Sequence, residues 1–266
     1  MHVQALYLYP VKSLAGLPAD QMTLDEFGPA GDRRWMIVDA SNRFVTQRER
    51  PELALVTAGL EDGRVTITVP DAGVHLLEPI GNAVTVEVWR DTVMAIPGPA
   101  SANQALSDYL KHPVRLVYMP DSSFRQIDPS RVPERRRVGF ADGFPFLVTN
   151  QASLEDLNQR LEQIVSMRRF RPNIVVAGAE PWEEDHWRAL AIGDHELSLV
   201  KPCSRCVMTT VDPYTGIKHA GAQPLRTLAG YRKTEDGVIF GMNAVHDRPG
   251  TLRIGDAVRV ITSETR

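Results

Sequence analysis

Cysteine is scarce in this sequence, because only Cys203 and Cys206 occur and they lie three positions apart. Two such cysteines exclude a disulfide framework and suit a reducing compartment. Long apolar runs are also lacking, since no stretch approaches the roughly 18 residues of a membrane span. The N-terminus has no basic segment followed by an apolar one, which argues against a secretory leader. We therefore expect a cytoplasmic protein with no membrane contact.

An excess of charge of one sign is missing as well. Lys plus Arg number 30 and Asp plus Glu number 33, so the net charge is −3. This balance gives no reason to expect nucleic acid or an anionic membrane as a partner. The length of 266 residues suits one or two domains, and 43% hydrophobic residues suit a globular core.

What the sequence does contain is a series of short β-prone segments separated by turn signals. The strands expected in the first hundred residues are 3–9, 34–38, 43–46, 53–60, 64–69 and 84–89. Asp62-Gly63 indicates a hairpin between the expected strands 53–60 and 64–69. The strands expected in the last third are 173–177, 196–201, 205–211, 238–240, 251–254 and 257–261. Strands of this length and spacing are typical of a sandwich or a barrel.

Helices are expected to be few. Ser101 can cap a helix that runs to about Lys111, because the following His-Pro pair stops it. A second helix is expected to start at Ser153, which with Asp156 resembles a capping box. Its apolar stripe would consist of Leu154, Leu157, Leu161 and Ile164.

Two stretches are expected to be irregular. Residues 120–143 hold three prolines and several arginines, which indicates a long connection between two domains with mostly solvated charges. Residues 181–187 mix acidic residues with a histidine and two tryptophans. An exposed acidic loop is the preferred interpretation there over a metal site.

The motif Cys203-Ser204-Arg205-Cys206 admits four interpretations from its spacing and flanks. A zinc site lacks further ligands at finger-like spacing. A redox pair lacks the helix start that lowers a thiol pKa, because both flanks are β-prone. Two buried, inert cysteines lead on these grounds. The fourth interpretation is one thiolate ligand for a cofactor metal, which the charge of Arg205 would favour.

The wider sequence adds to the fourth interpretation. Residues 203–216 resemble the signature of the MOSC domain (molybdenum cofactor sulfurase C-terminal), and further segments match in order at 8–13, 32–35, 170–174, 240–243 and 250–256. The chain resembles bacterial relatives of the mitochondrial amidoxime-reducing component over nearly its whole length. The resemblance implies a mainly β fold with a few helices (α+β) and two β-barrel-like domains, an N-terminal β-barrel at 1–119 and a MOSC domain at 120–266.

The resemblance also implies a site. Cys206 would ligate molybdenum, and Cys203 would be structural. The expected catalytic group is completed by Thr210 and Asp212, which either orient the ligand or, for Asp212, begin a turn. The positions implied for cofactor binding carry cationic, amide and other polar side chains that suit a pterin phosphate. They are Lys12, Ser13, Arg33, Asp142, Arg171, Asn173, Ser204, Arg205 and Asn243.

Alternatives remain open for some of these positions. Lys12 could be a solvated strand end, and Arg33 could pair with Asp32 or Glu26. Gly143 and Phe144 stand where the mitochondrial proteins carry small hydroxylated residues, and Asn243 stands where they carry an aromatic one. Side-chain contacts to the cofactor at these three positions would therefore differ.

The implied activity is reduction of N-hydroxylated compounds by a molybdenum–molybdopterin enzyme. Because no further cysteines exist for an iron–sulfur cluster, electrons are expected from a separate ferredoxin- or flavin-type protein. The alternative is a module that binds and carries the molybdenum cofactor, or carries sulfur on Cys206, without turning over a substrate.

Overall fold

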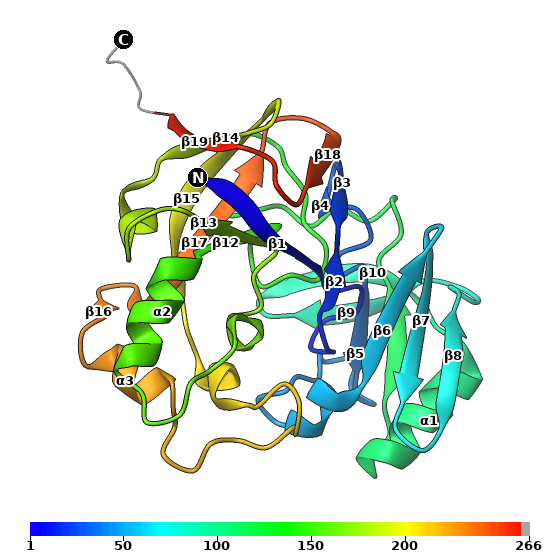
Figure 1. Cartoon of the computed structure of the whole chain (residues 1–266). Helices are drawn as coiled ribbons and strands as arrows, with labels where there is room; N and C mark the ends of the chain where they lie inside the picture. The colour runs from blue at the N-terminus through cyan, green and yellow to red at the C-terminus, as the bar shows by residue number, and fades with distance from the viewer. Residues whose placement is uncertain (262–266) are drawn as a thin grey trace.

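The computed structural model describes residues 1–261 and consists mainly of strands (Figure 1). The largest sheet of the described part follows the order β19-β14-β15-β17-β12-β13-β1-β2, and β16 pairs with β17. Its strands are β1 (His2–Leu8), β2 (Leu17–Ala19), β12 (Phe146–Asn150), β13 (Ile174–Ala177), β14 (Ala189–Ile192), β15 (His195–Ser204), β16 (Lys233–Thr234), β17 (Gly237–His246) and β19 (Val258–Ile261). β12 and β13 form a parallel pair within this otherwise antiparallel sheet.

Three smaller sheets complete the strands of the described residues. Their orders are β5-β11-β10-β9, β18-β3-β4 and β6-β7-β8. The bounds are β3 (Gln21–Asp25), β4 (Gly28–Pro29), β5 (Trp35–Val38), β6 (Thr57–Glu61), β7 (Arg64–Val69), β8 (Gly73–Leu77), β9 (Val84–Val88), β10 (Asp91–Pro97), β11 (Arg115–Tyr118) and β18 (Gly250–Arg253).

Helices are short and few, as the sequence predicts. The α-helices of residues 1–261 are α1 (Ala100–Leu110), α2 (Gln151–Gln159) and α3 (Leu225–Ala229). The 3₁₀-helices are η1 (Pro51–Leu55), η2 (Met167–Phe170), η3 (Glu183–His186) and η4 (Val207–Thr210). None of the described helices is long and apolar enough to cross a membrane.

The two ends of the chain share sheets. β1 pairs with β13 and with β2, and β3 pairs with β18. The first strands therefore lie against strands from the C-terminal half, and the remaining N-terminal strands form a separate lobe with α1 (Figure 1). A division of the chain near residue 119 stays a prediction.

The apolar cores follow this arrangement. One core lies on the large sheet and includes Leu6, Phe146 and Trp187. Two others fill the N-terminal lobe, one under α1 around Leu106 and one between strands around Met36. The predicted mainly β fold with a barrel-like N-terminal part is confirmed, and the hairpin at Asp62-Gly63 forms between β6 and β7.

The strand expected over residues 205–211 is wrong, because the chain forms the 3₁₀-helix η4 there. The hydroxyl of Thr209 donates to the carbonyl of Cys206 (2.9 Å), and that of Thr210 donates to the carbonyl of Val207 (2.7 Å). These local bonds offer the backbone an alternative to a strand ladder. Cys206 consequently stands at the start of a turn of helix.

The second helix also differs from its prediction. Its N-cap is Asn150, whose Oδ1 accepts a hydrogen bond from the Ala152 amide, and the helix ends at Gln159. Ser153 lies in the first turn and donates to Glu184. Ile164 lies beyond the helix and is 82% exposed, so the apolar stripe stops before it.

Other local predictions are also corrected. Residues 43–46 form only two isolated bridges, at Arg43 and Phe44, and residues 51–55 form η1 before β6 begins. In the connection 120–143, Arg137 is not solvated, because it lies over the Phe27 ring and donates to Ser123. The acidic loop is not wholly exposed either, since Glu184 and Trp187 are buried.

Candidate functional site

A cavity of about 320 Å³ lies where the N-terminal lobe meets the large sheet. The N-terminal side of its lining consists of Lys12, Ser13, Arg33, Thr46, Arg48 and Trp89. The polar and sulfur-bearing residues of the other side are Asp142, Arg169, Arg171, Asn173, Cys203, Ser204, Arg205, Cys206, Met208, Thr209 and Asn243. Loops that precede β5, β12 and β13, or follow β1 and β15, carry most of these groups.

The charge of the lining is strongly positive. Six cationic side chains and one carboxylate, that of Asp142, line the cavity in the described structure. Asp32 and Asp212 lie outside the lining and pair with Arg33 and Arg169. The remaining excess of positive charge suits an anionic ligand.

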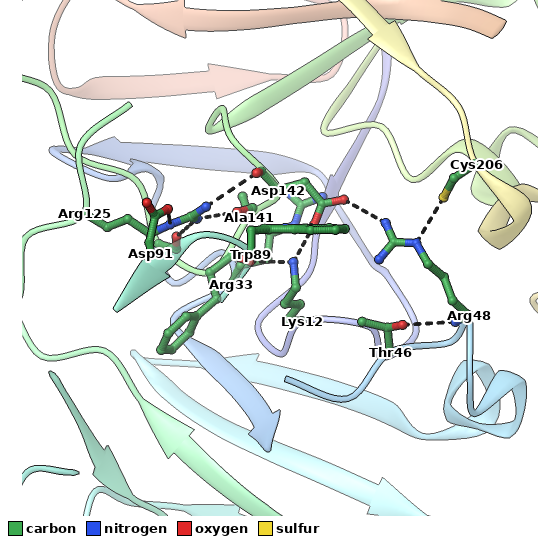
Figure 2. A network of polar contacts seen from close by, with 12 residues as sticks. Lys12, Arg33, Thr46, Arg48, Trp89, Asp91, Arg125, Ala141, Asp142 and Cys206 are labelled. Atoms are coloured by element: carbon green, nitrogen blue, oxygen red, sulfur yellow. Dashed lines mark hydrogen bonds and ion pairs between the residues drawn. The ribbon is translucent and has the colours of Figure 1, made fainter. Parts of the chain in front are cut away.

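A chain of polar contacts crosses the cavity from Lys12 to Cys206 (Figure 2). Lys12 Nζ donates to Asp142 Oδ1 at 2.5 Å and to the Phe140 carbonyl at 2.8 Å. Arg48 Nη2 donates to Asp142 Oδ2 at 3.4 Å, and Arg48 Nε donates to Cys206 Sγ at 3.3 Å. The sulfur atom is therefore held at the cavity by a cation.

Burial and charge act in opposite directions on the pKa values of this chain. Burial lowers the pKa of Lys12 to about 8, although Asp142 opposes the shift. Desolvation would raise the pKa of Asp142, but Lys12, Arg48 and Arg33 together hold it below its ordinary value. Because 61% of the Asp142 side chain is exposed to solvent, water weakens these ion pairs.

A second network supports the floor of the cavity. Arg33 Nη1 donates to Asp32 Oδ2 at 2.5 Å and to Asn173 Oδ1 at 3.0 Å. Asn173 Nδ2 in turn donates to Asp32 Oδ1 and to the Tyr7 carbonyl, both at 3.2 Å. The Leu147 amide also donates to Asn173 Oδ1. One buried amide side chain thus connects the N-terminal lobe to β12 and β13.

Two further cations have no carboxylate partner among the described residues. Arg171 donates to the Leu14 carbonyl at 2.6 Å and lies over the Tyr9 ring, and burial lowers its pKa to about 10. Arg205 donates to Cys203 Sγ at 2.8 Å and to the Phe170 carbonyl at 2.6 Å. Its Nε is buried with no hydrogen-bond partner in the described structure.

Backbone conformation also singles out this cavity. Four of the ten non-glycine residues with positive φ in the described chain line it, namely Ser13, Arg33, Trp89 and Arg171. Such conformations are uncommon for residues with a Cβ and concentrate at functional sites. The strain supports a site whose side chains are held in fixed positions.

The donors present fit a phosphate-bearing metal cofactor. Arg171 and the unpartnered Arg205 Nε suit an anionic oxygen, and Cys206 Sγ supplies one soft ligand. No group of three or more His, Cys, Asp or Glu that could hold a metal ion exists within residues 1–261. A metal bound by Cys206 would therefore take its further ligands from a cofactor or from water.

Comparison with known proteins gives the family. The MOSC domain model matches residues 135–259, and the model of the MOSC N-terminal beta barrel domain matches residues 1–113. The chain belongs to the MOSC family. Mitochondrial amidoxime-reducing component 1 from Homo sapiens is 34% identical over 97% of the chain and 82% of its own length. The Mus musculus protein of the same name is 36% identical over the same shares, and human component 2 is 33% identical over 96% of the chain and 82% of its own length.

In this MOSC protein the structure brings together most of the residues expected from the sequence. Cys206 and all nine positions expected to bind the cofactor line one cavity. Lys12 is buried rather than a solvated strand end, and Arg33 pairs with Asp32. Both cysteines are half-buried and free, so they are not buried core residues.

Thr210 and Asp212 do not line the cavity. Arg169, which does, donates to the Thr210 carbonyl at 3.1 Å and to Asp212 Oδ2 at 2.7 Å. Asp212 Oδ1 also accepts the amides of Tyr214 and Thr215, so this residue forms a turn as well. In this MOSC protein both residues therefore contact the lining of the cavity through Arg169, Thr210 only by its backbone carbonyl.

The sequence reasoning missed Thr46, Arg48, Trp89 and Arg169. Arg48 and Trp89 lie in loops with no motif around them, and only the fold places them at the cavity. Arg169 carried a usable signal, because it lies next to the matching segment that starts at Phe170. Arg125 was missed too, and its buried guanidinium donates to the carbonyls of Gly139 and Ala141, which fixes the Asp142 loop.

Proposed function

We propose that this MOSC protein binds a molybdenum–molybdopterin cofactor through Cys206 and reduces N-hydroxylated compounds. The observation that carries the proposal is the position of Cys206 Sγ at the edge of a cavity lined by six cations. A thiolate is a ligand for a soft metal, and the cations suit the anionic pterin phosphate. The names of the relatives, amidoxime-reducing components, support the reaction class.

In the proposed reaction an N-hydroxylated substrate accepts two electrons and two protons, its N–O bond breaks, and the amine or amidine leaves with one water. The bound cofactor would supply the electron transfer and the oxygen acceptor. Arg171, Arg205 and Lys12 would bind and orient the cofactor's anionic groups. The Arg33–Asn173 network would hold both sides of the cavity at a fixed separation.

The electron source in this proposal is a separate protein, of ferredoxin or flavin type. Its support is that the two cysteines of the chain are too few for an iron–sulfur cluster. A reducing, cytoplasmic location would keep both thiols free and stays part of the proposal.

The test compares three proteins purified from a host that makes the cofactor. We expect the wild type and Cys203→Ser to contain about one molybdenum per chain and Cys206→Ser to contain almost none, because one thiolate anchors the metal. With a chemical reductant, the wild type should reduce benzamidoxime and Cys206→Ser should not. The measurements are metal analysis and product quantification.

Two outcomes would redirect the proposal. A wild type loaded with molybdenum that reduces no N-hydroxylated compound would indicate the carrier function. A wild type without molybdenum from such a host would remove the cofactor assignment altogether.

A further inference from the structure

Trp89 occupies an unusual place for a large aromatic residue. It lies at the tip of the hairpin between β9 and β10 with a φ of 57°, a conformation that glycine and asparagine adopt most easily. The residue is 45% exposed although it lines the cavity. Neither the turn nor the apolar core explains a tryptophan here.

The inner side of the ring is held by specific contacts. Its Nε1 donates to Asp142 Oδ1 at 3.2 Å, its centroid lies 5.0 Å from that of Phe44, and the Arg48 guanidinium lies 4.7 Å from its centroid. These contacts fix the ring at the cavity. Much of the remaining ring surface is exposed to a molecule that enters the cavity.

Arg48 connects this ring to Cys206. Its Nε donates to Cys206 Sγ, its amide donates to Thr46 Oγ1, and its carbonyl accepts a hydrogen bond from Lys218 at 2.6 Å. Within residues 1–261, Nη1 makes no hydrogen bond, so the guanidinium retains one free donor. Figure 2 shows the guanidinium lying between Asp142 and Cys206.

We propose that Trp89 and Arg48 form the substrate-facing wall of the cavity and select N-hydroxylated compounds with a conjugated ring. This inference rests on the proposed function. The face of an aromatic ring carries negative partial charge and does not favour a phosphate, whereas it stacks well on a flat conjugated group. The free N–H of Arg48 can donate to the oxygen of the N–OH group.

The test uses two substrates that share the reacting group. Benzamidoxime carries a ring and acetamidoxime carries a methyl group in its place. Trp89→Asn removes the ring but keeps a residue that tolerates the left-handed turn. We expect KM for benzamidoxime to rise about tenfold through the lost stacking contact, while KM for acetamidoxime changes by less than about twofold.

Two further variants separate the ring from its surroundings. Trp89→Phe keeps an aromatic face and should keep the preference for benzamidoxime. Arg48→Lys should raise KM for both amidoximes, because the lost guanidinium N–H would serve the N–OH group that they share. The matched controls are Ile80→Asn, another exposed apolar residue, and Arg43→Lys, a surface arginine paired with Glu87. Neither control lines the cavity, and both should behave as the wild type.

Binding gives a readout that does not depend on turnover. Benzamidoxime should quench part of the tryptophan fluorescence of the wild type, and this part should be absent in Trp89→Phe. Trp35 and Trp187 are buried, and Trp182 packs on Tyr231 and Phe240, so Trp89 is the tryptophan that lines the cavity. Molybdenum content is measured for every variant.

The outcomes distinguish the two proposals. Quenching through Trp89 without reduction of either amidoxime would overturn the proposed reductase function but support the proposed substrate-facing wall. Reduction of both substrates, with Trp89→Asn changing their KM values equally or not at all, would overturn the wall. If Trp89→Asn loses molybdenum in proportion to its loss of activity, the ring contacts the cofactor rather than the substrate. That result would also overturn the proposal of a substrate-facing wall.

Discussion

Arg205 shows at the scale of one residue how the cavity is prepared for an anion. Two of its nitrogens donate to Cys203 Sγ and to the Phe170 carbonyl, whereas Nε is buried without a partner in the described structure. A buried polar group left unpaired costs about 1–3 kcal/mol. The charge of this residue, which lines the cavity, favours a state in which an anionic ligand is bound.

We expect Arg205→Lys to retain the fold but to hold the cofactor at least about tenfold less tightly. The ammonium keeps the charge but loses the fork of donors, and a hydrogen bond to a charged group contributes about 1.5–3 kcal/mol. The measurement is molybdenum retained after prolonged dialysis. Arg43→Lys, at the surface, is the matched control; equal retention in both variants would contradict the role of Arg205.

At the scale of elements, Glu184 joins η3 to the start of α2. Its Oε2 accepts hydrogen bonds from Ser153 Oγ (2.7 Å) and Asn150 Nδ2 (3.1 Å), while Oε1 is buried without a partner in the described structure. Desolvation raises the pKa of Glu184 from 4.5 to about 7. The folded protein therefore binds this proton more tightly than the unfolded chain does.

This shift gives a pH dependence with a defined sign. Between about pH 4.5 and pH 7 the folded state holds more protons than the unfolded state, so the contribution of Glu184 to the free energy of unfolding falls as pH rises. Residue 184 does not titrate in Glu184→Gln. The free energy of unfolding of this variant, relative to that of the wild type, should therefore rise by up to about 3 kcal/mol between pH 4.5 and pH 8. Urea unfolding at several pH values measures this, with Glu155→Gln, exposed on α2, as the control; parallel pH profiles for wild type and Glu184→Gln would contradict it.

At the scale of the whole molecule, the cavity belongs to neither half of the chain. Lys12, Arg33 and Arg48 come from the N-terminal part, and Cys206, Arg171 and Arg205 come from the C-terminal part. β1 lies in the large sheet and leads directly to Lys12, so the sheet positions both sides. A ligand that contacts both sides adds to the free energy of unfolding of the complete protein.

We therefore expect removal of the cofactor to lower Tm by roughly 10 °C. A ligand present at a thousandfold excess over its Kd stabilises the folded state by about 4 kcal/mol, and each kcal/mol shifts Tm by about 2–4 °C at this size. The comparison is wild type from hosts with and without cofactor synthesis. Cys206→Ser should show the same low Tm from both hosts, and an unchanged Tm in molybdenum-loaded wild type would contradict the bridging role.

Local sequence determined many of the strands and much of the site. β7, β9, β13 and β19 follow β-branched segments between turn residues, and α1 follows a helix-forming stretch that a His-Pro pair ends. Cys206, Lys12, Arg33 and Asn173 lie in segments that resemble the MOSC family, and all of them line the cavity. These features depend on neighbours in the chain, which the sequence displays directly.

The features that depend on residues far apart in the chain are fixed only by the tertiary structure. Arg48 and Trp89 became part of the site only when β9, β10 and the loop before η1 packed against the Asp142 segment. Residues 205–211 are β-prone, yet the hydroxyls of Thr209 and Thr210 turn them into η4 and aim Cys206 at the cavity. Glu184 is buried because α2 and η3 enclose it. Burial, charge pairing and cavity shape are sums over residues far apart in the chain, so only the folded arrangement fixes them.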